Sequence, residues 1–295
     1  MTDFPRRIAF ALVGYGRFGK HHANVLKHHP NAAVEAICET DHIALKQARV
    51  DFPDAKIYTE PINMLQEIKV NAVSVVSPED THASIVRAAL NNGFHVFCEK
   101  PPGRTVKEIK KVIIQEKRKK LIKLKYGFNH RYHDAVVKLS KIIKSKKYGE
   151  IINFRGVYGK SKIITFSNSD WRSKRSAAGG GILLDQGIHL IDLILNLTSE
   201  IKEVRSFISN NYWKHNVEDN AYVMFKDKKG VVAMIHSTAT QWEHKFRLEI
   251  TLEKALIELT GILSGSKSYG KEKLRIVDKS KNKKVSVSNF NFTKD

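Results

Sequence analysis

The first 130 residues alternate between short apolar runs and longer segments of helical character. The short runs have the length of buried strands and cover residues 8–14, 34–39, 72–77 and 95–99. Residues 17–27 and 81–92 lie between such runs, and the second segment has the apolar spacing of an amphipathic helix. Repeated strand–helix units predict a parallel sheet that is covered by helices on both faces. Because such crossovers are right-handed, we expect a doubly wound fold.

The second half of the chain has a different pattern. Residues 150–159 alternate like a strand, and residues 181–197 form one long, largely apolar helical pattern. The strand-like runs that follow cover residues 204–209, 221–226, 231–237, 246–253, 256–259 and 274–277. Their short connections predict a mostly antiparallel sheet. The sequence therefore predicts an α/β protein, with a doubly wound parallel domain at residues 1–128 and an α+β domain with an open, mostly antiparallel sheet at residues 129–295.

A glycine-rich turn joins the first expected strand to the first expected helix. Gly14, Gly16 and Gly19 form a GxGxxG pattern there, and Glu39 ends the next strand. Such glycines permit a tight turn and a close approach to a pyrophosphate, and the acid binds ribose hydroxyls. Glu39 repels a 2′-phosphate, so the expected cofactor is NAD rather than NADP. The alternative is a glycine turn that binds no ligand.

A lysine follows the expected strand at residues 95–99. Ligands of open α/β sheets bind beyond the carboxyl ends of the strands, so Lys100 should point into the cofactor crevice. An ammonium group there can hold a substrate oxygen and stabilise negative charge on it. The alternative is an ordinary surface lysine.

The apolar helical pattern after Gly179-Gly180-Gly181 carries three polar residues. Asp185, His189 and Asp192 stand at positions i, i+4 and i+7, which share one stripe of a helix. A carboxylate one turn from an imidazole orients it and favours its charged form, which suits a general acid or base. The alternative is a helix edge that reaches solvent.

Composition narrows the class of protein. The net charge is +21, but the lysines are spread along the chain and have helical spacing between apolar residues, which does not favour a nucleic-acid surface. The two cysteines lack the spacing of a metal site, so no metal is expected and a reducing compartment is indicated. The apolar pattern at residues 181–197 is interrupted by charges, and the N-terminus lacks a signal core. A cytoplasmic protein without a membrane partner is therefore expected.

Taken together, these segments resemble the glucose-fructose oxidoreductase / inositol dehydrogenase / rhizopine-catabolism (Gfo/Idh/MocA) superfamily over nearly the whole chain. The matching segments are GYGRFG (14–19), Glu39, VVSPEDTH (75–82), FCEKPPG (97–103), YGFNHRY (126–132), DWR (170–172) and GGGILLDQGIHLID (179–192). The resemblance implies a Rossmann domain followed by a substrate-binding and oligomerisation domain. It departs at the end of the chain, where VSVSNFNFTKD shows no helical pattern.

The resemblance also implies a role for each matching residue. Lys100, Asp185 and His189 form the implied catalytic set, with His189 taking the hydroxyl proton. The residues implied at the cofactor are Gly14, Gly16, Arg17, Phe18, Gly19, Glu39, Ser77, Pro78, His82, Glu99 and Lys100. Those implied at the substrate are Lys100, Trp171, Arg172, Asp185 and His189, with Asp170 beside them and His244 as a further candidate.

The implied activity is hydride transfer between NAD and a secondary hydroxyl or ketone of a sugar or nucleotide sugar. The EKPPG and GGGILLDQGIH segments look most like members from bacterial surface-glycan gene clusters, which points to an amino sugar or its nucleotide. The alternative is a non-catalytic NAD-binding regulatory or interaction protein on the same fold. Since an open sheet must bury its free face, we also expect a homodimer or homotetramer that packs through the second domain.

Overall fold

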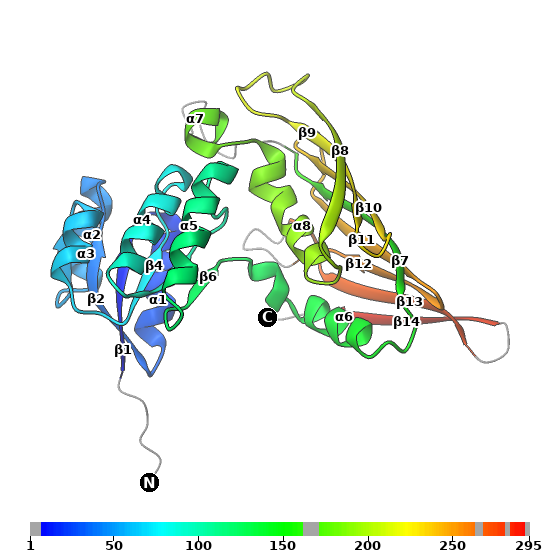
Figure 1. Cartoon of the computed structure of the whole chain (residues 1–295), viewed down its shortest axis with the longest axis horizontal. Helices are drawn as coiled ribbons and strands as arrows, with labels where there is room; N and C mark the ends of the chain where they lie inside the picture. Colours follow the sequence, from blue (N-terminus) through cyan, green and yellow to red (C-terminus); the bar gives the residue numbers. More distant parts are fainter. Residues whose placement is uncertain (1–6, 162–170, 263–267, 281–283, 293–295) are drawn as a thin grey trace, which may run out of the picture. The chain divides into compact units, whose positions relative to one another are not determined.

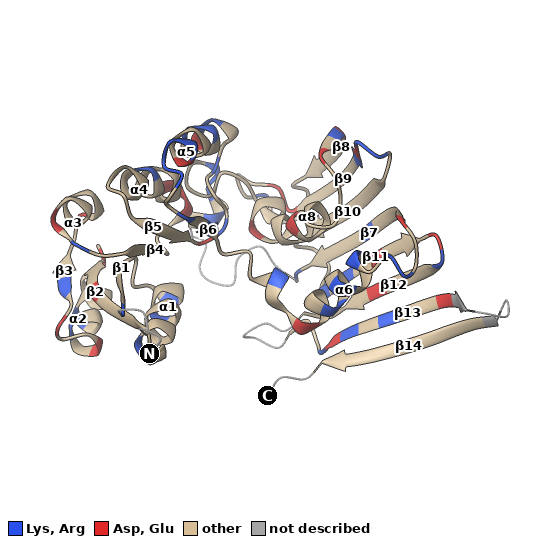
Figure 2. Cartoon of the chain, turned by 60° about the horizontal axis from the view of Figure 1, so that its bottom comes forward, with Lys and Arg blue, Asp and Glu red and all other residues tan. Residues whose placement is uncertain are grey.

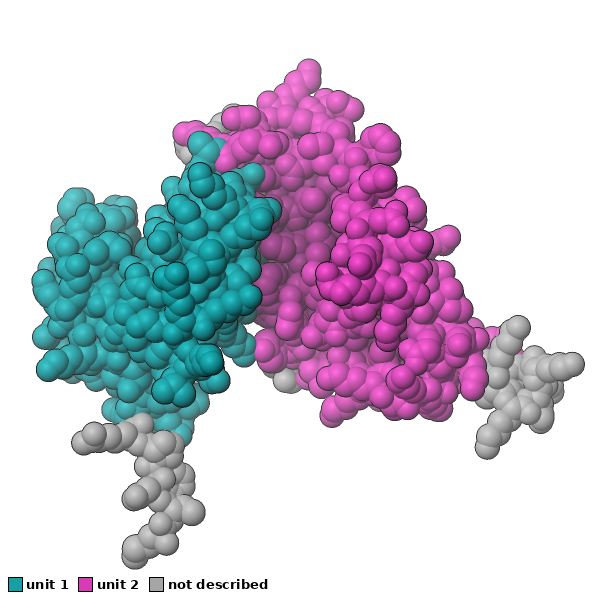
Figure 3. Space-filling model, viewed as in Figure 1, with its two compact units in different colours: residues 1–127, 176–179 teal, residues 128–175, 180–295 magenta. Residues whose placement is uncertain are grey.

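The computed structural model describes residues 7–161, 171–262, 268–280 and 284–292 of the 295-residue chain. The chain divides into two compact units, which Figure 3 shows in different colours. Unit 1 comprises residues 1–127 and 176–179, and unit 2 comprises residues 128–175 and 180–295.

Unit 1 is a six-stranded parallel sheet with the strand order β3-β2-β1-β4-β5-β6 (Figure 1). Its strands are β1 (Ile8–Val13), β2 (Ala32–Cys38), β3 (Lys56–Tyr58), β4 (Ala72–Val75), β5 (His95–Cys98) and β6 (Leu124–Tyr126). Its helices are α1 (Arg17–His28), α2 (His42–Asp51), α3 (Pro61–Glu67), α4 (Glu79–Asn91) and α5 (Val106–Arg118). The strand order reverses direction at β1, where a doubly wound sheet places its ligand crevice.

Both faces of this sheet are buried. Along β1, Ala11 and Val13 belong to one core cluster, which includes Leu90 of α4, whereas Leu12 belongs to another, which includes Ala23 of α1. Successive side chains of a strand point to opposite faces, so helices cover the sheet on both sides. The doubly wound parallel fold predicted for this half of the chain is confirmed.

Unit 2 is an eight-stranded sheet with the order β14-β13-β12-β11-β7-β10-β9-β8. Its strands are β7 (Ile151–Gly159), β8 (Ile201–Ser209), β9 (Asn220–Asp227), β10 (Val232–Thr238), β11 (Lys245–Leu252), β12 (Ala255–Thr260), β13 (Glu272–Ser280) and β14 (Lys284–Phe292). Helices α6 (Asp134–Lys144) and α8 (Ile188–Leu195) pack on one face of it, as Figure 1 shows. The predicted open, mostly antiparallel sheet is confirmed, with β7 and β10 as its parallel pair.

Two elements differ from the prediction for the second half. The expected single helix at residues 181–197 is a π-helical turn, Leu183–Gly187, followed by the shorter helix α8. The strand β14 lies where the sequence showed no helical pattern and no strand was predicted. Val285, Val287, Phe290 and Phe292 alternate there with polar residues, which is a strand pattern that the sequence reading missed.

Among the described residues, one helical stretch, Arg175–Leu195, is long and apolar enough to cross a membrane by length and composition. Half of its apolar window is buried in the structure. Leu190, Leu193 and Ile194 of α8 lie in the core of unit 2 against β7 and its neighbours. Its apolar character is therefore accounted for by packing against the sheet.

Basic residues are spread over many elements of both units, among them α5, α6 and β13 (Figure 2). In the parts of the chain that the structure describes, the basic residues behind the net charge of +21 are therefore not confined to one element.

Candidate functional site

The glycine turn between β1 and α1 is shaped by close approaches of backbone. Gly14 has a φ of 96°, and a Cβ atom there would lie 2.8 Å from the backbone of Val76 and Ser77. A Cβ atom on Gly19 would overlap the carbonyl oxygen of Gly14. Gly16, by contrast, has no heavy atom within 4 Å of its Cβ position. The turn thus leaves open space at the glycine where a pyrophosphate would approach the start of α1.

Glu39 lies beside this turn at the end of β2. Its Oε2 accepts a hydrogen bond of 2.5 Å from the N–H of Tyr15, and its Oε1 accepts from the N–H groups of Thr40 (2.7 Å) and Asp41 (2.9 Å). Three backbone amides therefore fix a carboxylate where the ribose hydroxyls of a dinucleotide bind in such folds. Arg17 and Phe18 are exposed in the first turn of α1. The residues present fit a dinucleotide.

The carboxyl ends of β4 and β5 are tied together by a buried histidine. The two ring nitrogens of His82 each lie 2.8 Å from a carbonyl oxygen, Nδ1 from that of Pro101 and Nε2 from that of Ser77. His82 is 1% exposed, so it braces the two loops from inside. The Oγ of Ser77 also lies 2.6 Å from Oγ1 of Thr81, and Pro78 is exposed before α4.

Lys100 follows β5, is partly buried, and is joined to Pro101 by a cis peptide bond. Its N–H donates to Oε2 of Glu99 at 3.3 Å. Oε1 of Glu99 lies 3.0 Å from Nε2 of His22, a residue of α1. The carboxylate of Glu99 therefore connects the helix that follows the glycine turn with the backbone of Lys100.

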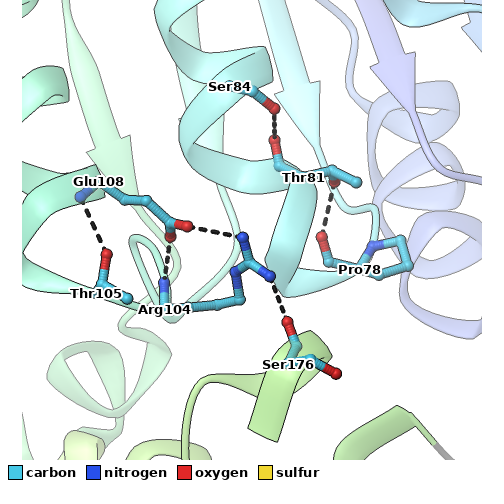
Figure 4. A network of polar contacts seen from close by, with 7 residues as sticks. All are labelled: Pro78, Thr81, Ser84, Arg104, Thr105, Glu108 and Ser176. Carbon is cyan, nitrogen blue, oxygen red and sulfur yellow. Dashed lines mark hydrogen bonds and ion pairs between the residues drawn. The ribbon is translucent and has the colours of Figure 1, made fainter. Parts of the chain in front are cut away.

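Arg104 follows Gly103 and binds residues 176–179, the second chain segment that belongs to unit 1 (Figure 4). Its N–H and Nη2 donate to the two carboxylate oxygens of Glu108, each at 2.8 Å, and its Nη1 donates to the carbonyl of Ser176. Burial alone would raise the pKa of Glu108, but these bonds from Arg104 hold it below its usual value. Gly179 packs so closely that a Cβ there would lie 2.6 Å from Cβ of Arg104.

In unit 2, Asp185 forms an ion pair. Its Oδ2 accepts from Nζ of Lys160 at 3.0 Å and from Nε2 of Gln186 at 3.1 Å. Lys160 directly follows β7 and is anchored by a bond from its N–H to the carbonyl of Thr238. Both side chains of the pair are largely buried, with 15% of Lys160 and 22% of Asp185 exposed. Two donors therefore orient the carboxylate of Asp185.

His189 lies on α8 and is 6% exposed. The imidazole of His130 stacks on it with ring centroids 4.0 Å apart and an angle of 12° between the planes. Phe128 meets the same ring edge-on at 6.2 Å. His130 and Phe128 lie in or just before a 3₁₀ turn, Asn129–Tyr132, that leads into α6.

An aromatic series extends this cluster toward His244. Tyr158 of β7 lies beside His189, Tyr269 packs edge-on against Tyr158 at 5.3 Å, and His244 packs edge-on against Tyr269 at 4.9 Å. Burial raises the pKa of both tyrosines, and their proximity to Asp185 raises it further. Both hydroxyls therefore keep their protons at neutral pH.

Arg172 lies over the ring of Trp171, with Cζ 4.3 Å from the ring centroid, in the 3₁₀ turn Trp171–Ser173 of unit 2. Asp170, which was expected beside them, lies outside the described residues.

The structure gathers the sequence candidates in two groups. In unit 1 the glycine turn, Glu39, the Ser77–His82 bracing and Lys100 all lie at the carboxyl edge of the sheet. In unit 2, Asp185, His189 and His244 share one polar and aromatic cluster. The sequence reasoning did not single out four members of that cluster: His130, Tyr158, Lys160 and Tyr269. Lys160 follows a strand end, as Lys100 does, and this position could have identified it.

Two family profiles match the chain. Residues 8–128 match the profile described as "Oxidoreductase family, NAD-binding Rossmann fold", and residues 136–258 match the profile described as "GFO/IDH/MocA C-terminal domain". Together they span most of the chain.

Several curated relatives are named as dehydrogenases of sugars or polyols. The chain is 27% identical to the myo-inositol 2-dehydrogenase of Thermotoga maritima, over 83% of this chain and 73% of that protein. It is 30% identical to the D-glucoside 3-dehydrogenase of Escherichia coli, over 65% of this chain and 54% of that protein. The match to the levoglucosan dehydrogenase of Pseudarthrobacter phenanthrenivorans, at 32% identity, spans 50% of this chain and only 38% of that protein.

Solved structures share the fold. Levoglucosan dehydrogenase in complex with NADH and levoglucosan superposes with a TM-score of 0.84 at 24% identity, over 97% of this chain and 80% of that one. The WlbA dehydrogenase of Bordetella pertussis, in complex with NADH and UDP-GlcNAcA, has a TM-score of 0.80 at 22% identity, over 88% of this chain and 74% of that one.

Proposed function

The chain belongs to the Gfo/Idh/MocA oxidoreductase family, and from this premise we propose that it is an NAD-dependent dehydrogenase of a sugar or polyol. The reaction would transfer hydride between the nicotinamide ring and a secondary hydroxyl, or the corresponding ketone. The observation that carries the proposal is the cluster in unit 2, where a buried imidazole, His189, accompanies the Lys160–Asp185 ion pair. A buried imidazole beside an oriented carboxylate can accept the proton of a substrate hydroxyl.

Each group has a proposed task in this reaction. His189 takes the proton of the substrate hydroxyl, and Asp185 accepts hydrogen bonds from neighbouring hydroxyls. Lys160 keeps Asp185 ionised and fixes its position. Lys100 holds the reacting oxygen and stabilises charge on it. The bound nicotinamide supplies the acceptor for the hydride.

The cofactor assignments rest on unit 1. The glycine turn and the first turn of α1, including Arg17 and Phe18, are proposed to bind the pyrophosphate. Glu39 is proposed to accept the ribose hydroxyls and to exclude a 2′-phosphate, which makes NAD the preferred cofactor. Ser77, Pro78 and Glu99 are proposed to line the nicotinamide side, where His82 braces the loops.

The names of the relatives and the net charge of the chain guide the proposed substrate class. Relatives named for inositol, glucosides and levoglucosan favour a neutral ring with several hydroxyls. The net charge of +21 attracts anions, which keeps a nucleotide-activated amino sugar of surface-glycan synthesis among the candidates. Trp171, Arg172 and His244 are the proposed substrate contacts besides the central cluster. The presence of Lys100, Asp185 and His189 together argues against a non-catalytic NAD-binding protein.

The test is a screen for nicotinamide reduction or oxidation with free sugars, inositols and nucleotide sugars. We expect turnover of at least one class, with kcat reduced roughly 100-fold or more in Lys100→Ala and His189→Ala. Lys69→Ala, a surface lysine far along the chain from Lys100, should keep full activity. Full activity of both site variants would contradict the residue assignment, and NADH binding without any turnover would favour the non-catalytic alternative.

We further propose that residues 1–128 act as the dinucleotide domain and residues 129–295 as the substrate and oligomerisation domain. The free face of the unit 2 sheet exposes apolar side chains on adjacent strands, among them Phe207 (80% exposed), Tyr222 (51%) and Met234 (47%). We propose a homodimer or homotetramer that covers this face, in a cytoplasmic protein.

A further inference from the structure

The candidate base His189 is stacked against a second histidine that the proposed chemistry does not use. The two rings are nearly parallel, 4.0 Å apart, and each residue is 6% exposed. Stacked, buried imidazoles restrict each other in two ways. Each ring fixes the plane of the other, and a charge on one ring disfavours a charge on its neighbour.

His130 is itself held in place by two hydrogen bonds. Its Nδ1 donates to Oδ1 of Asn129 at 2.9 Å, and its Nε2 lies 3.1 Å from the hydroxyl of Tyr158. Burial raises the pKa of Tyr158 well above its usual value, so that hydroxyl keeps its proton. Phe246 closes another side, edge-on at 5.9 Å. These contacts fix the orientation of the His130 ring.

Charged and titratable groups on the elements around the stack occur as pairs. His133, 5.3 Å from His130, is paired with Glu272 of β13. Arg131 is paired with Asp192 of α8 at 2.5 Å, and Lys160 with Asp185 at 3.0 Å. Tyr158 and Tyr269 are neutral. Arg131 and Lys160 offset the charges of the carboxylates that they pair with, and the stacked partner ring is nearer than His133, so a proton taken up by either stacked ring is felt most by the other ring.

We propose that His130 is a positioning residue for His189, which fixes the plane of the His189 ring and opposes its protonation whenever His130 is itself charged. The stack thereby keeps His189 in the neutral form that accepts a proton. This inference rests on the proposed function, because the role of His189 as a base is part of that proposal. The stack itself is observed within unit 2 alone.

The test combines two readouts on the full chain. The first is the titration of the histidine rings, followed by NMR on protein with ring-labelled histidine, with the His189 signal assigned from its loss in His189→Gln. In His130→Phe, which keeps a stacked ring but no proton site, we expect the His189 titration midpoint to rise by about one pH unit. An unchanged midpoint would overturn the electrostatic part of the proposal.

The second readout is kinetic. His130→Ala should lower kcat by about tenfold or more with KM within roughly threefold, because a base held in the wrong plane is slow but substrate contacts remain. His130→Phe should recover most of that loss, and His95→Phe, an exposed histidine at the start of β5, should change neither readout. Equal kcat in wild type and His130→Ala would overturn the positioning role.

Two outcomes separate this inference from the function it builds on. If wild type turns over no sugar but the His189 midpoint still rises in His130→Phe, the proposed function fails and the coupling of the stack stands. If turnover is found and the midpoint does not move, the coupling fails alone. Should His130→Ala unfold, the midpoint and kcat of His130→Phe decide, with NADH affinity as the check that unit 1 is intact.

Discussion

At the residue scale, the sequence predicted the groups that a motif or a strand end marks, and it did not reveal the groups that support them. The GxGxxG turn and Glu39 could be predicted because few local geometries require those residues together. His130 and Tyr158 could not, because a histidine in a turn and a tyrosine near the end of a strand have no local pattern that distinguishes them from ordinary structural residues. Their relation to His189 arises from three chain segments, around residues 130, 158 and 189, which only the fold brings together.

The three glycines of the turn differ in what an added methyl group would meet, which yields a prediction. Gly16→Ala should fold almost as well as wild type, with a loss of about 0.5 kcal/mol or less, since its Cβ position is open. It should bind NADH roughly tenfold or more weakly, because the methyl group occupies the approach of the pyrophosphate. Gly19→Ala should lose about 1–3 kcal/mol of stability, since its Cβ would overlap the carbonyl of Gly14.

Thermal unfolding and NADH titration of the two variants measure both effects. If Gly16→Ala bound NADH as wild type does, the pyrophosphate would not lie at this turn.

At the element scale, the period of the apolar residues and the length of the apolar runs predicted most strands and helices. They did not predict the local type of a helix or which strands pair with each other. Residues 181–197 have the apolar content of one helix, yet Leu183–Gly187 is π-helical, which changes the angular offset between Asp185 and His189. The parallel pairing of β7 with β10 joins strands about eighty residues apart, and no local pattern encodes it. Such long-range choices are decided by packing of the whole sheet.

The turn between β9 and β10 offers a prediction of stability and its pH dependence. Asp227 is 3% exposed and accepts from Ser199, Lys229 and Val231, at distances from 2.8 to 3.1 Å. Burial alone would raise its pKa, but these hydrogen bonds hold the pKa of Asp227 below its usual value. Asp227→Asn should therefore cost about 1–3 kcal/mol near neutral pH.

The sign of the pH effect follows from the lowered pKa. The contribution of Asp227 is complete above its unfolded-state pKa of about 3.9 and is lost as the pH falls through the folded-state value. The difference between wild type and Asp227→Asn in denaturant unfolding should thus be constant from about pH 8 to 5 and shrink below about pH 4. A difference that grew on acidification would contradict this assignment, and Asp54→Asn, at an exposed position, serves as the control.

At the scale of the whole molecule, the free face of the unit 2 sheet combines two kinds of surface. Over β8–β10 it is apolar, with Met224 and Met234 directly opposite each other on adjacent strands. Over β11–β13 it is charged, with Arg247 and Arg275 bound to Glu258. An apolar patch with a charged margin is the composition of a protein–protein interface.

Met234→Asp should therefore separate the proposed oligomer into monomers, because a carboxylate would be buried in its apolar centre. Light scattering at micromolar concentration measures the mass, and we expect twice or four times the 33.6 kDa of one chain for wild type. Ile114→Asp, at an exposed position of α5, should keep the wild-type mass. A monomeric wild type would contradict the proposal.

The central claim is that unit 1 is a working NAD site, and calorimetric titration with NADH and, separately, NADPH tests it most directly. The account predicts that NADH binds at least about tenfold more tightly than NADPH, since Glu39 accepts ribose hydroxyls and repels a 2′-phosphate. Glu39→Gln should narrow that difference. Equal binding of the two cofactors would contradict the role given to Glu39, and binding of neither would contradict the dehydrogenase proposal as a whole.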